Sequence, residues 1–569
     1  MMLRITKFAQ SVRCWLAFVA AAALVVLCSC NPAPKYSKPP VNAPQAFKES
    51  APDQFKEGPG WKVAQPGDDK LRGKWWEMYN DPVLNSLEEQ VQISNQTVIQ
   101  AEANFRAARA LVVSARSALF PTIGAAPSYT NSRFSSTTRT AVVTPGSSVP
   151  TGTPSSGGAT TTTTSGSGTS NVVNSFSLPF EITYTVDFWH RIRNQVAANA
   201  FSAQASAADV ATALLSTHAA LAEDYFEVRA LDAQEGILQD TLKNYRDALN
   251  LTTTLFNAGI DSDEEVAQAR TQLDTATAEA TDLGVARAQF EHAIATLMGK
   301  PAAEFSLPVA PFIPNPPQIP VAVPSEMLER RPDIAAAERQ VAAANAEIGI
   351  ARAAYYPNLT LSATGGFQTS HFTEWFTWPS RFWSLGPTLS QTLLDFGARR
   401  GLNEQAEASY DASVASYRQT VLSDFQSVED QLSALRIYAQ EVSQYETAIH
   451  SSAHFLELSL TRFRTGVDSY LNVITAQNAV LNNRETQVAT QLKQMNASVS
   501  LIMALGGGWD ASQLPQMKDL LAKPGKWSPN GTAIPAGQLA PANPPVVAPI
   551  ALPPGAQTGT STRPPGASH

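Results

Sequence analysis

The sequence predicts an internally duplicated α+β fold with long helices and few strands. Residues 256–262 (FNAGIDS) reappear as residues 463–469 (FRTGVDS), and residues 298–299 match residues 505–506 at the same 207-residue offset. Each copy also contains a strand-like segment of alternating apolar residues and a long helical stretch without proline. Self-similarity of this length indicates two copies of one structural unit, so any function must be built from both copies.

The amino terminus reads as an export signal over residues 1–29. Three basic residues, Arg4, Lys7 and Arg13, precede a charge-free apolar stretch, residues 15–27, which is shorter than the ~20 residues of a membrane-spanning helix. The stretch leads into the sequence LCSC, which resembles a bacterial lipobox and places Cys30 at the lipidated position. We therefore expect a lipid anchor at Cys30 and a tether over residues 30–74. The alternative is ordinary signal cleavage that leaves Cys30 as a free thiol.

Composition restricts the classes of function. Only 16% of the chain is charged and the net charge is −8, which argues against a nucleic-acid partner because such a partner needs a basic patch. No apolar run after residue 30 is long enough for a transmembrane helix, so a membrane crossing would have to use strands. Asn31 follows the cysteine in place of the aspartate that often retains lipoproteins at the inner membrane, which favours the outer membrane.

The first repeat is expected over residues 75–300. It begins with a helix over residues 75–119, for which Asp81 is the start signal and Pro121 the stop. A weakly patterned strand follows Pro121. Residues 144–170 are almost wholly Gly, Ser, Thr and Pro, so they are predicted to form a flexible loop that buries too little apolar surface to order itself.

Alternating apolar and polar residues predict the other strands. Every second residue is apolar in residues 176–187, and residues 383–393 repeat the pattern in the second copy. Residues 359–364 supply the remaining strand, so each copy contributes two strands and the chain four. Four strands leave two open edges, which a membrane interior does not tolerate, so a membrane-spanning sheet would need other chains to close it. Three chains would supply twelve strands, above the minimum of about eight for a barrel.

Two very long helices are predicted, over residues 189–256 and 398–463. Neither stretch contains proline, and each would extend roughly 100 Å at ~1.5 Å per residue. Each also has a narrow apolar seam with heptad-like spacing, which is typical of coiled-coil packing. The seam residues are Leu221, Tyr225, Val228, Leu231, Leu238, Leu242, Tyr245 and Leu249 in the first copy, and Val428, Leu432, Leu435, Tyr438, Tyr445 and Ile449 in the second.

Each long helix is expected to end at a glycine, Gly259 or Gly466, because glycine adopts the left-handed conformation that helix ends often need. A second helix is predicted to return over residues 262–298 in the first copy and residues 469–505 in the second. The two glycines would therefore lie at the turns of two helical hairpins.

Several short motifs are distributed over most of the chain. They are residues 36–44 (YSKPPVNAP), 75–77 (WWE), 81–82 (DP), 330–334 (RRPDI), 356–359 (YPNL), 394–397 (LDFG), 462–471 (RFRTGVDSYL) and 504–509 (ALGGGW). Together they resemble the TolC/OprM-like outer-membrane efflux lipoproteins, also called the NodT family. The resemblance covers about residues 30–509, and only the 144–170 insert and the C-terminal tail lie outside it.

The resemblance implies a TolC-like homotrimer, with a twelve-stranded β-barrel in the outer membrane that continues into a periplasmic α-helical barrel. An equatorial linker over residues 301–332 would join the copies, residues 333–509 would form the second copy, and residues 510–569 would be a proline-rich disordered tail. The implied function is the outer-membrane channel of a tripartite efflux pump, which passively conducts drugs or other small molecules. Its partners would be a periplasmic adaptor (a membrane fusion protein) and an inner-membrane RND-type pump.

The hairpin turns would form the periplasmic aperture and the adaptor contact. The residues assigned there are Gly259, Asp261, Asp263, Glu264, Glu265, Arg462, Arg464, Gly466, Asp468 and Leu471. In a trimer the acidic residues after Gly259 would form a ring that repels anions. The alternative is that they stabilise the start of the returning helix. We also expect Arg462 and Arg464 to pair with these carboxylates and hold the aperture closed.

The second turn departs from the family. The family often carries an aspartate ring one helical turn beyond this turn, whereas the matching positions here hold Asn472 and Thr475. The departure argues against a cation site in the second hairpin. Leu471 is a candidate for an apolar constriction, with ordinary helix packing as the alternative.

Nothing in the sequence points to an enzyme, a cofactor or a metal site. The seven histidines are scattered, and residues 506–508 (GGG) follow a helix, whereas a phosphate-binding glycine loop precedes one. Two other functions remain open: a structural coiled-coil lipoprotein of the envelope, and a TolC-like duct for protein secretion. The alternating strands argue against the structural lipoprotein, because a scaffold does not need them. The substrate is not readable from the sequence.

Overall fold

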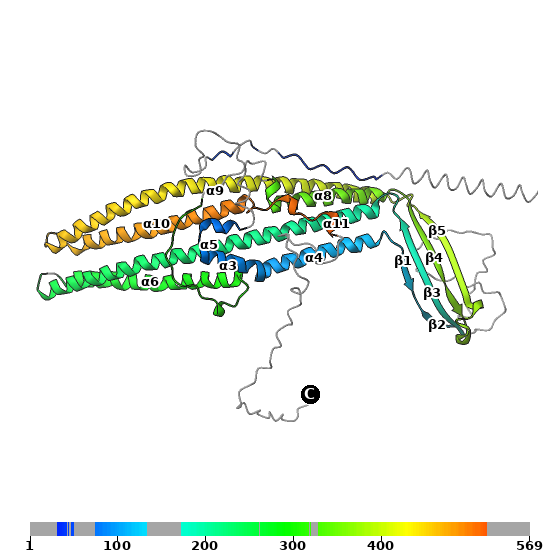
Figure 1. The fold of residues 1–569 in the computed structure, drawn as a ribbon, viewed down its shortest axis with the longest axis horizontal. Coiled ribbons are helices and arrows are strands. Elements are labelled where there is room, and N and C mark those ends of the chain that lie inside the picture. Colours follow the sequence, from blue (N-terminus) through cyan, green and yellow to red (C-terminus); the bar gives the residue numbers. More distant parts are fainter. Residues whose placement is uncertain are drawn as a thin grey trace, which may run out of the picture. The chain divides into compact units, whose positions relative to one another are not determined.

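The described part of the chain consists of long helices and one antiparallel sheet (Figure 1). The structure is a computed structural model and describes residues 31–41, 44, 47–49, 74–133, 172–260, 262–317, 319 and 328–520. The predicted signal peptide, Cys30, the 144–170 insert and Asp261 therefore lie outside the described residues.

Two long hairpins dominate the helices. Helix α5 (Arg191–Asn257) returns as α6 (Asp263–Leu297), and α9 (Ala398–Arg464) returns as α10 (Tyr470–Ala504). Helices α5 and α9 have 67 residues each, which confirms the predicted lengths of roughly 100 Å. The matching lengths of α6 and α10, 35 residues each, confirm the duplication. In Figure 1 the turns of both hairpins lie at the end of the helices far from the sheet.

Shorter helices pack on the long helices of the hairpins. Helix α4 (Gln96–Ser117) packs on α5, and α8 (Pro332–Ala353) packs on both α5 and α9. The remaining short elements are η2 (Trp75–Tyr79), α3 (Pro82–Ser94), η3 (Ala302–Glu304), η4 (Phe372–Glu374), η5 (Trp378–Ser380), η6 (Ala511–Gln513) and α11 (Met517–Leu520). Among the described residues, no helix is both long enough and apolar enough to cross a membrane.

The main core lies where helices of the two copies meet. It joins Trp75 and Trp76 of η2 to residues of α5, α9 and α10, and most seam residues named above are buried. Those with side chains buried are Leu221, Tyr225, Val228, Leu231, Leu238, Leu242, Tyr245, Val428, Leu432 and Leu435. The outer members Leu249, Tyr438, Tyr445 and Ile449 are half-buried, so the packing predicted from the heptad-like spacing is confirmed along most of its length.

The sheet has the order β1–β3–β4–β5, and β2 also pairs with β3. Its strands are β1 (Thr122–Ala125), β2 (Ser128–Arg133), β3 (Val172–Val186), β4 (Asn358–Thr369) and β5 (Arg381–Ser390). Because β1 and β2 pair with successive parts of β3, they act as one interrupted strand. The predicted four strands, two from each copy, are therefore confirmed. The last strand ends at Ser390, earlier than the expected residue 393.

The helix predicted over residues 75–119 is wrong as a single element. It consists of η2, α3 and α4, and the break falls at Asn95. Asn95 leaves the helical conformation, and its Oδ1 accepts hydrogen bonds from the backbone N–H groups of Thr97 (2.9 Å) and Val98 (3.1 Å). A side-chain cap of this kind starts a new helix. The start signal at Asp81 is confirmed, since its Oδ1 accepts from Val83 N at 2.8 Å.

The disorder expected over residues 510–569 is wrong for the first part of this range. The chain remains ordered to Leu520, whose side chain is buried. Gln204 Nε2 donates to the carbonyl of Pro515 (2.8 Å), and Arg109 Nε donates to the carbonyl of Leu520 (2.9 Å). These contacts attach residues 511–520 to α4 and α5. The proline-rich remainder, residues 521–569, lies outside the described residues.

The amino-terminal segment lies against helices of both copies. Asn31 Oδ1 accepts a hydrogen bond from Asn194 Nδ2 (3.2 Å) in the first turn of α5, and Glu49 pairs with Arg436 of α9 (2.7 Å). Between them, the hydroxyl of Tyr36 hydrogen-bonds to Glu338 of α8. Asn31, the first described residue, therefore lies at the N-terminal end of α5, which is connected to β3.

Candidate functional site: the sheet faces and the hairpin turns

The register of the sheet separates its side chains into an apolar and a polar face. Directly opposed residues of an antiparallel pair share a face. Ile182 lies opposite Ala363, and Ala363 opposite Leu385, so apolar positions align across the strands. The apolar face contains Phe176, Leu178, Phe180, Ile182, Tyr184, Val186, Leu359, Leu361, Ala363, Phe367, Trp383, Leu385, Pro387 and Leu389. The other face is mainly Ser, Thr and Gly, with Glu181, Pro179 and Phe382, and the predicted alternation is confirmed.

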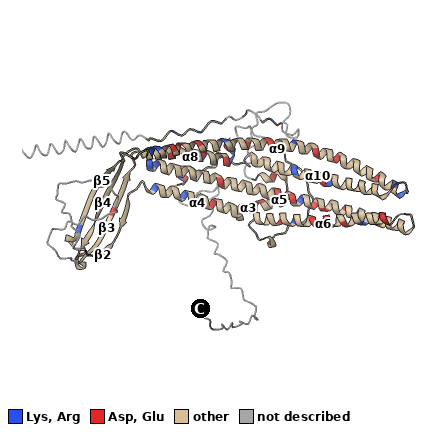
Figure 2. Ribbon diagram, turned by 180° about the vertical axis from the view of Figure 1, so that it is seen from behind, with Lys and Arg blue, Asp and Glu red and all other residues tan. Residues whose placement is uncertain are grey.

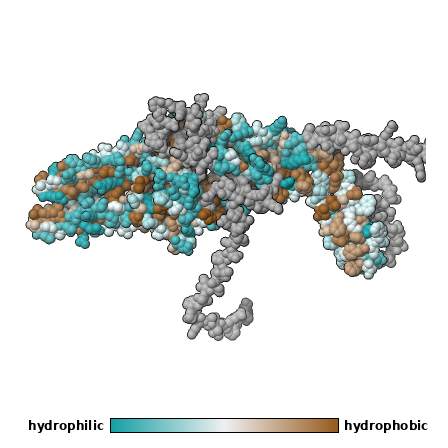
Figure 3. Space-filling model, in the orientation of Figure 1, coloured by the Kyte–Doolittle hydropathy of each residue, from teal (hydrophilic) through white to brown (hydrophobic). Residues whose placement is uncertain are grey.

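The apolar face is widely exposed in the single chain. The side chains of Trp383, Leu385 and Leu389 are 78%, 72% and 68% exposed. Figure 3 shows hydrophobic residues gathered over the sheet, and Figure 2 shows most charges on the helices. A contiguous apolar surface of this kind requires lipid or another apolar surface as its partner.

Aromatic side chains lie at both ends of the apolar face. The cluster at the end far from the helices contains Tyr129, Phe176, Phe367, Phe372, Trp375 and Phe376. At the helix end Trp189 stacks on Tyr356 with ring centroids 4.5 Å apart, and its Nε1 donates to the carbonyl of Pro357 (2.9 Å). Aromatic belts at the two borders of an apolar band are typical of membrane-spanning sheets.

The two hairpin turns have the same backbone geometry. Gly259 and Gly466 have φ values of 75° and 72°, in the left-handed region. The N–H of Ile260 donates to the carbonyl of Leu255 (2.9 Å), and Val467 closes the second turn in the same way. These bonds are the helix-ending motif that glycine favours, so both predicted turn positions are confirmed. The apolar side chains presented at the turns are those of Ile260, Val467 and Leu471.

The acidic residues of the first turn serve the start of α6. Asp263, Glu264 and Glu265 occupy its first helical turn, and Glu265 N donates to Ser262 Oγ (3.4 Å). Carboxylates at a helix N-terminus are stabilised by the helix dipole, so the structure supports this explanation of the acidic cluster. Glu265 Oε1 also accepts from the N–H of Tyr470 (3.4 Å), which links the first hairpin to the second.

The arginines of the second turn do not make the expected contacts within one chain. Arg462 Nε lies 3.4 Å from Asp468 Oδ2 of its own turn, and the described residues give Arg464 no ion pair. Asp468 Oδ1 also accepts from Asn472 Nδ2 (2.5 Å). The carboxylate of Asp468 is therefore occupied locally, and Glu265 rather than an arginine joins the two turns.

A polar contact between the hairpins was missed by the sequence analysis. Gln272 Nε2 of α6 donates to Asn478 Oδ1 of α10 (2.6 Å) and to the hydroxyl of Tyr245 in α5 (3.1 Å). The Tyr245 hydroxyl also donates to Asn478 Oδ1 (3.2 Å). No spacing rule predicts contacts among three separate helices. Together with Glu265, these residues hold the hairpins of one chain together.

Each copy also contains a buried ionisable pair where the helices cross. Arg331 Nη2 lies 2.7 Å from Asp424 Oδ1, and burial raises the pKa of Asp424 to about 7. In the first copy His218 Nδ1 lies 2.6 Å from Glu88 Oε2. Burial lowers the pKa of His218 to about 4 and raises that of Glu88.

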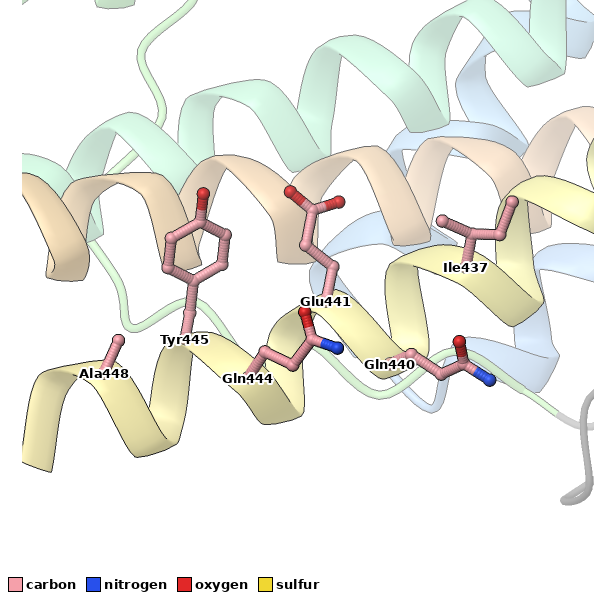
Figure 4. A pocket seen from close by; sticks show the side chains of 6 residues that line it. All are labelled: Ile437, Gln440, Glu441, Gln444, Tyr445 and Ala448. Atoms are coloured by element: carbon pink, nitrogen blue, oxygen red, sulfur yellow. The ribbon is translucent and has the colours of Figure 1, made fainter.

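A hollow of about 430 Å³ lies beside α9 and is lined by Ile437, Gln440, Glu441, Gln444, Tyr445 and Ala448 (Figure 4). All six residues belong to one helix, so the hollow is a surface depression. Within the described residues, no three His, Cys, Asp or Glu side chains are placed to hold a metal ion.

Comparisons with known proteins agree with this geometry. The family model described as "Outer membrane efflux protein" matches residues 87–300 and 323–507. The pyoverdine export outer membrane protein OpmQ of Pseudomonas aeruginosa is 29% identical over 508 residues, which cover 88% of this chain and 98% of OpmQ. A probable efflux pump outer membrane protein of Pseudomonas putida, TtgC, is 26% identical over 86% of this chain and 95% of its own length.

Solved structures show the same fold. The outer-membrane channel OprN matches with a TM-score of 0.69 and 26% identity, covering 84% of this chain and all of that one (100%). The CmeC outer membrane channel of Campylobacter jejuni matches with a TM-score of 0.71 at 19% identity, over 86% of this chain and 97% of CmeC.

The long duplicated hairpins and the two-faced sheet are therefore those of an outer-membrane efflux channel. The chain belongs to the outer membrane efflux protein family, with a family match over more than half of its length. The predicted TolC-like fold, the outer-membrane location and the role as the outer-membrane component of an efflux pump are confirmed.

Proposed function

We propose that three copies of this chain form one continuous duct for small molecules. The observation that carries this proposal is the register of the sheet, which presents one apolar and one polar face and leaves β5 and β1/β2 as edges without a partner strand in the described chain. Unpaired strand edges are not tolerated inside a membrane. Three such sheets would close a twelve-stranded barrel with the apolar face toward lipid and the polar face toward water.

The helices would continue this duct into the periplasm. At roughly 100 Å, α5 and α9 are long enough to carry a conduit well beyond a membrane. The hairpin turns would form its inner aperture and meet a periplasmic adaptor, a membrane fusion protein, through the exposed residues Ile260, Val467 and Leu471. An inner-membrane RND-type pump would supply the energy, and the duct itself would catalyse no reaction.

The cargo would be small organic molecules. Similar proteins are named for export of toluene, antibiotics and pyoverdine, which differ widely in polarity. The polar face of the sheet is rich in Ser, Thr and Gly, and among the described strand residues Glu181 is its only charged side chain, which suits a duct that selects little by charge. These features favour small molecules over proteins as cargo.

A lipid at Cys30 would add a second attachment to the membrane. Asn31, the residue after Cys30, contacts Asn194, which is the fourth residue of α5. This contact holds Asn31 at the end of α5 that is connected to β3. A lipid chain on Cys30 would then begin near the border of the apolar face. Mass spectrometry of the mature protein would detect the expected acyl groups, and their absence would contradict the anchor.

Single-channel conductance in planar bilayers, combined with the mass of the purified protein in solution, tests the duct. We expect discrete conductance steps from a species with the mass of three chains. A monomer or dimer that never conducts would overturn the trimeric duct and favour a structural lipoprotein.

A further inference from the structure

Arg381 lies within the aromatic cluster at the end of the sheet far from the helices. It is the first residue of β5 and stands opposite Phe367, which stands opposite Leu178, so it belongs to the apolar face. Its guanidinium lies over the ring of Trp378, 3.5 Å from the ring centroid. The position therefore combines a cation with an exposed aromatic platform on a surface that is otherwise apolar.

The connection between β4 and β5 fixes this pair in place. Ser380 Oγ and Thr377 Oγ1 both donate to the carbonyl of Glu374, at 2.6 and 2.7 Å. Ser380 is buried, whereas Trp378 is 76% exposed. The loop is thus closed on itself by hydroxyl contacts, and it presents Trp378 and Arg381 outward from a defined backbone.

The charge of Arg381 has no counterpart in the described part of the chain. Its described contacts are with the rings of Trp378 and Phe367, and none of the described residues gives its guanidinium a hydrogen bond or an ion pair. Arginine on a lipid-facing strand is costly at the centre of a membrane and is tolerated near its borders. An unpaired arginine here suggests an anionic group supplied from outside the chain.

Arg381 lies near the border of the apolar face, at the end of the sheet far from the helices. Leu389 is the last residue of β5 on the apolar face, and Arg381 is eight residues away, or ~26 Å along the strand at ~3.3 Å per residue. A strand tilted by about 40° therefore places Arg381 within a few ångströms of the border of a band about 25 Å tall. On β3 the same face becomes polar just beyond this level, where Asn131 Nδ2 donates to Asn174 Oδ1 (2.6 Å).

We propose that Arg381, supported by Trp378, binds the phosphate group of a membrane lipid in the leaflet at this end of the sheet. A planar guanidinium can donate two parallel hydrogen bonds to phosphate oxygens, and stacking on Trp378 fixes its orientation for that purpose. The apolar side chains below Arg381 receive the acyl chains of the same lipid. This inference rests on the proposed membrane-spanning sheet, and it adds a lipid-binding site to it.

The test measures lipid binding to the purified full-length assembly by native mass spectrometry. Phosphatidic acid is compared with diacylglycerol of the same acyl chains, which lacks the phosphate. We expect the wild type to prefer phosphatidic acid, and Arg381→Gln to bind it roughly tenfold more weakly because a charged hydrogen-bonding partner is lost. Binding of diacylglycerol should not change.

The matched control is Arg400→Gln. Arg400 is 81% exposed and pairs with Glu404 on α9, outside the sheet, so this variant should bind phosphatidic acid as the wild type does. Trp378→Leu keeps the charge but removes the platform, and it should give an intermediate loss. Arg381→Lys also keeps the charge, and it serves as a second variant if the glutamine variant does not assemble.

Three results would overturn the site. The first is that wild type and Arg381→Gln bind phosphatidic acid equally well. The second is that Arg400→Gln loses as much phosphatidic acid binding as Arg381→Gln. The third is that inorganic phosphate at equal concentration displaces phosphatidic acid, which would show a free-ion site instead of a lipid site. Conductance is recorded on the same preparations. Normal conductance with unchanged lipid preference rejects only the lipid site, whereas absence of conductance in the wild type rejects the proposed duct.

Discussion

In each copy of the repeat, a side chain at the start of a shorter helix donates a hydrogen bond to the end of the returning helix. We call this contact the helix joint, and the two copies build it from different side chains. In the first copy Asn95, the cap of α4, donates through Nδ2 to the carbonyl of Leu297 at the end of α6 (2.7 Å). In the second copy Arg331 precedes α8 and donates through Nη1 to the carbonyl of Ala504 at the end of α10 (2.9 Å). Both bonds satisfy a carbonyl that the end of a helix leaves without a partner. The bond is therefore present in both copies, with a neutral donor in the first and a charged donor in the second.

The charged joint at Arg331 brings further ionisable groups together, which the neutral joint at Asn95 does not. Arg331 is also paired with Asp333 and with the buried carboxyl group of Asp424, so three ionisable groups take the place of one amide. At the 207-residue offset from Asp424, α5 carries Thr217, and the first copy places its ionisable pair at His218 instead. Equivalent joints in one chain can therefore differ in their sensitivity to mutation and to pH.

The largest difference between the joints should appear on removing their donors. At pH 8, above the pKa of Asp424, Arg331→Gln leaves the buried carboxylate of Asp424 without its cation, so we expect a loss of about 4 kcal/mol in the free energy of unfolding. Asn95→Ala removes a cap and one neutral hydrogen bond, with an expected loss of about 1–2 kcal/mol. Urea unfolding of the two variants measures both values. Equal losses would show that the charge of the second joint is unimportant, and adding Asp424→Asn to Arg331→Gln should restore part of the stability.

The glycines that follow α6 and α10 should behave alike. A Cβ at Gly299 would overlap the carbonyl oxygen of Ser94, and one at Gly506 that of Arg330, and both glycines have positive φ. We expect Gly299→Ala and Gly506→Ala each to lower stability by about 3 kcal/mol, from backbone strain plus overlap. Gly259→Ala is the control, because its φ is 75° but no atom lies within 4 Å of the added Cβ, so strain alone remains. A loss at Gly259 as large as at Gly506 would contradict the role of the close contact.

The second joint should also respond to pH through Asp424. Its pKa is raised to about 7 by burial, above the ordinary value of about 3.9, so the folded state retains a proton that the unfolded state releases. The resulting stability is fully present below pH ~4 and is lost as the pH rises through about 7. Relative to Asp424→Asn, we therefore expect the wild type to lose about 2 kcal/mol between pH 5 and pH 8.

Thermal or urea unfolding at several pH values checks this dependence. The control is Asp411→Asn, which changes an exposed aspartate on the same helix and should leave the pH dependence as in the wild type. An identical pH profile for Asp424→Asn and the wild type would rule out Asp424 as the titrating group.

The smallest effect is expected where the two copies meet near the turns. Asn478→Ala removes the acceptor shared by Gln272 and Tyr245, which should weaken the contact between the hairpins by about 1 kcal/mol. If this contact holds the aperture closed, the mean conductance should rise a few-fold. Asn482→Ala, an exposed change one turn further along α10, is the control. Conductance that stays at the wild-type value in Asn478→Ala would exclude the contact from gating.

Local patterns predicted most of the elements correctly. The proline-free stretches and the glycines Gly259 and Gly466 define the long helices and their turns, because both depend on backbone preferences that act within a few residues. Alternation defined the strands for the same reason. The single helix expected over residues 75–119 failed because Asn95, which looks like an ordinary polar residue, leaves the helix to reach the carbonyl of Leu297 across the fold.

In the candidate sites, too, the sequence predicted local features but not contacts between distant residues. The turn positions were predicted because they follow a local repeat, whereas the partners of the charged residues were not. Arg462 pairs with Asp468 of its own turn, and Glu265 reaches the N–H of Tyr470 in the other hairpin. Such pairings depend on which helices become neighbours, and no spacing in the sequence encodes that choice.

By itself the sequence determined the duplication, the length of the helices, the position of the turns and the alternation of the strands. Each of these follows from the period of the side chains and from the backbone preferences of glycine and proline. The tertiary structure alone decided that most apolar strand positions align on one face, because this depends on the register between strands of different copies. It also decided that equivalent joints received Asn95 and Arg331 in roles that only the packing of distant helices can define.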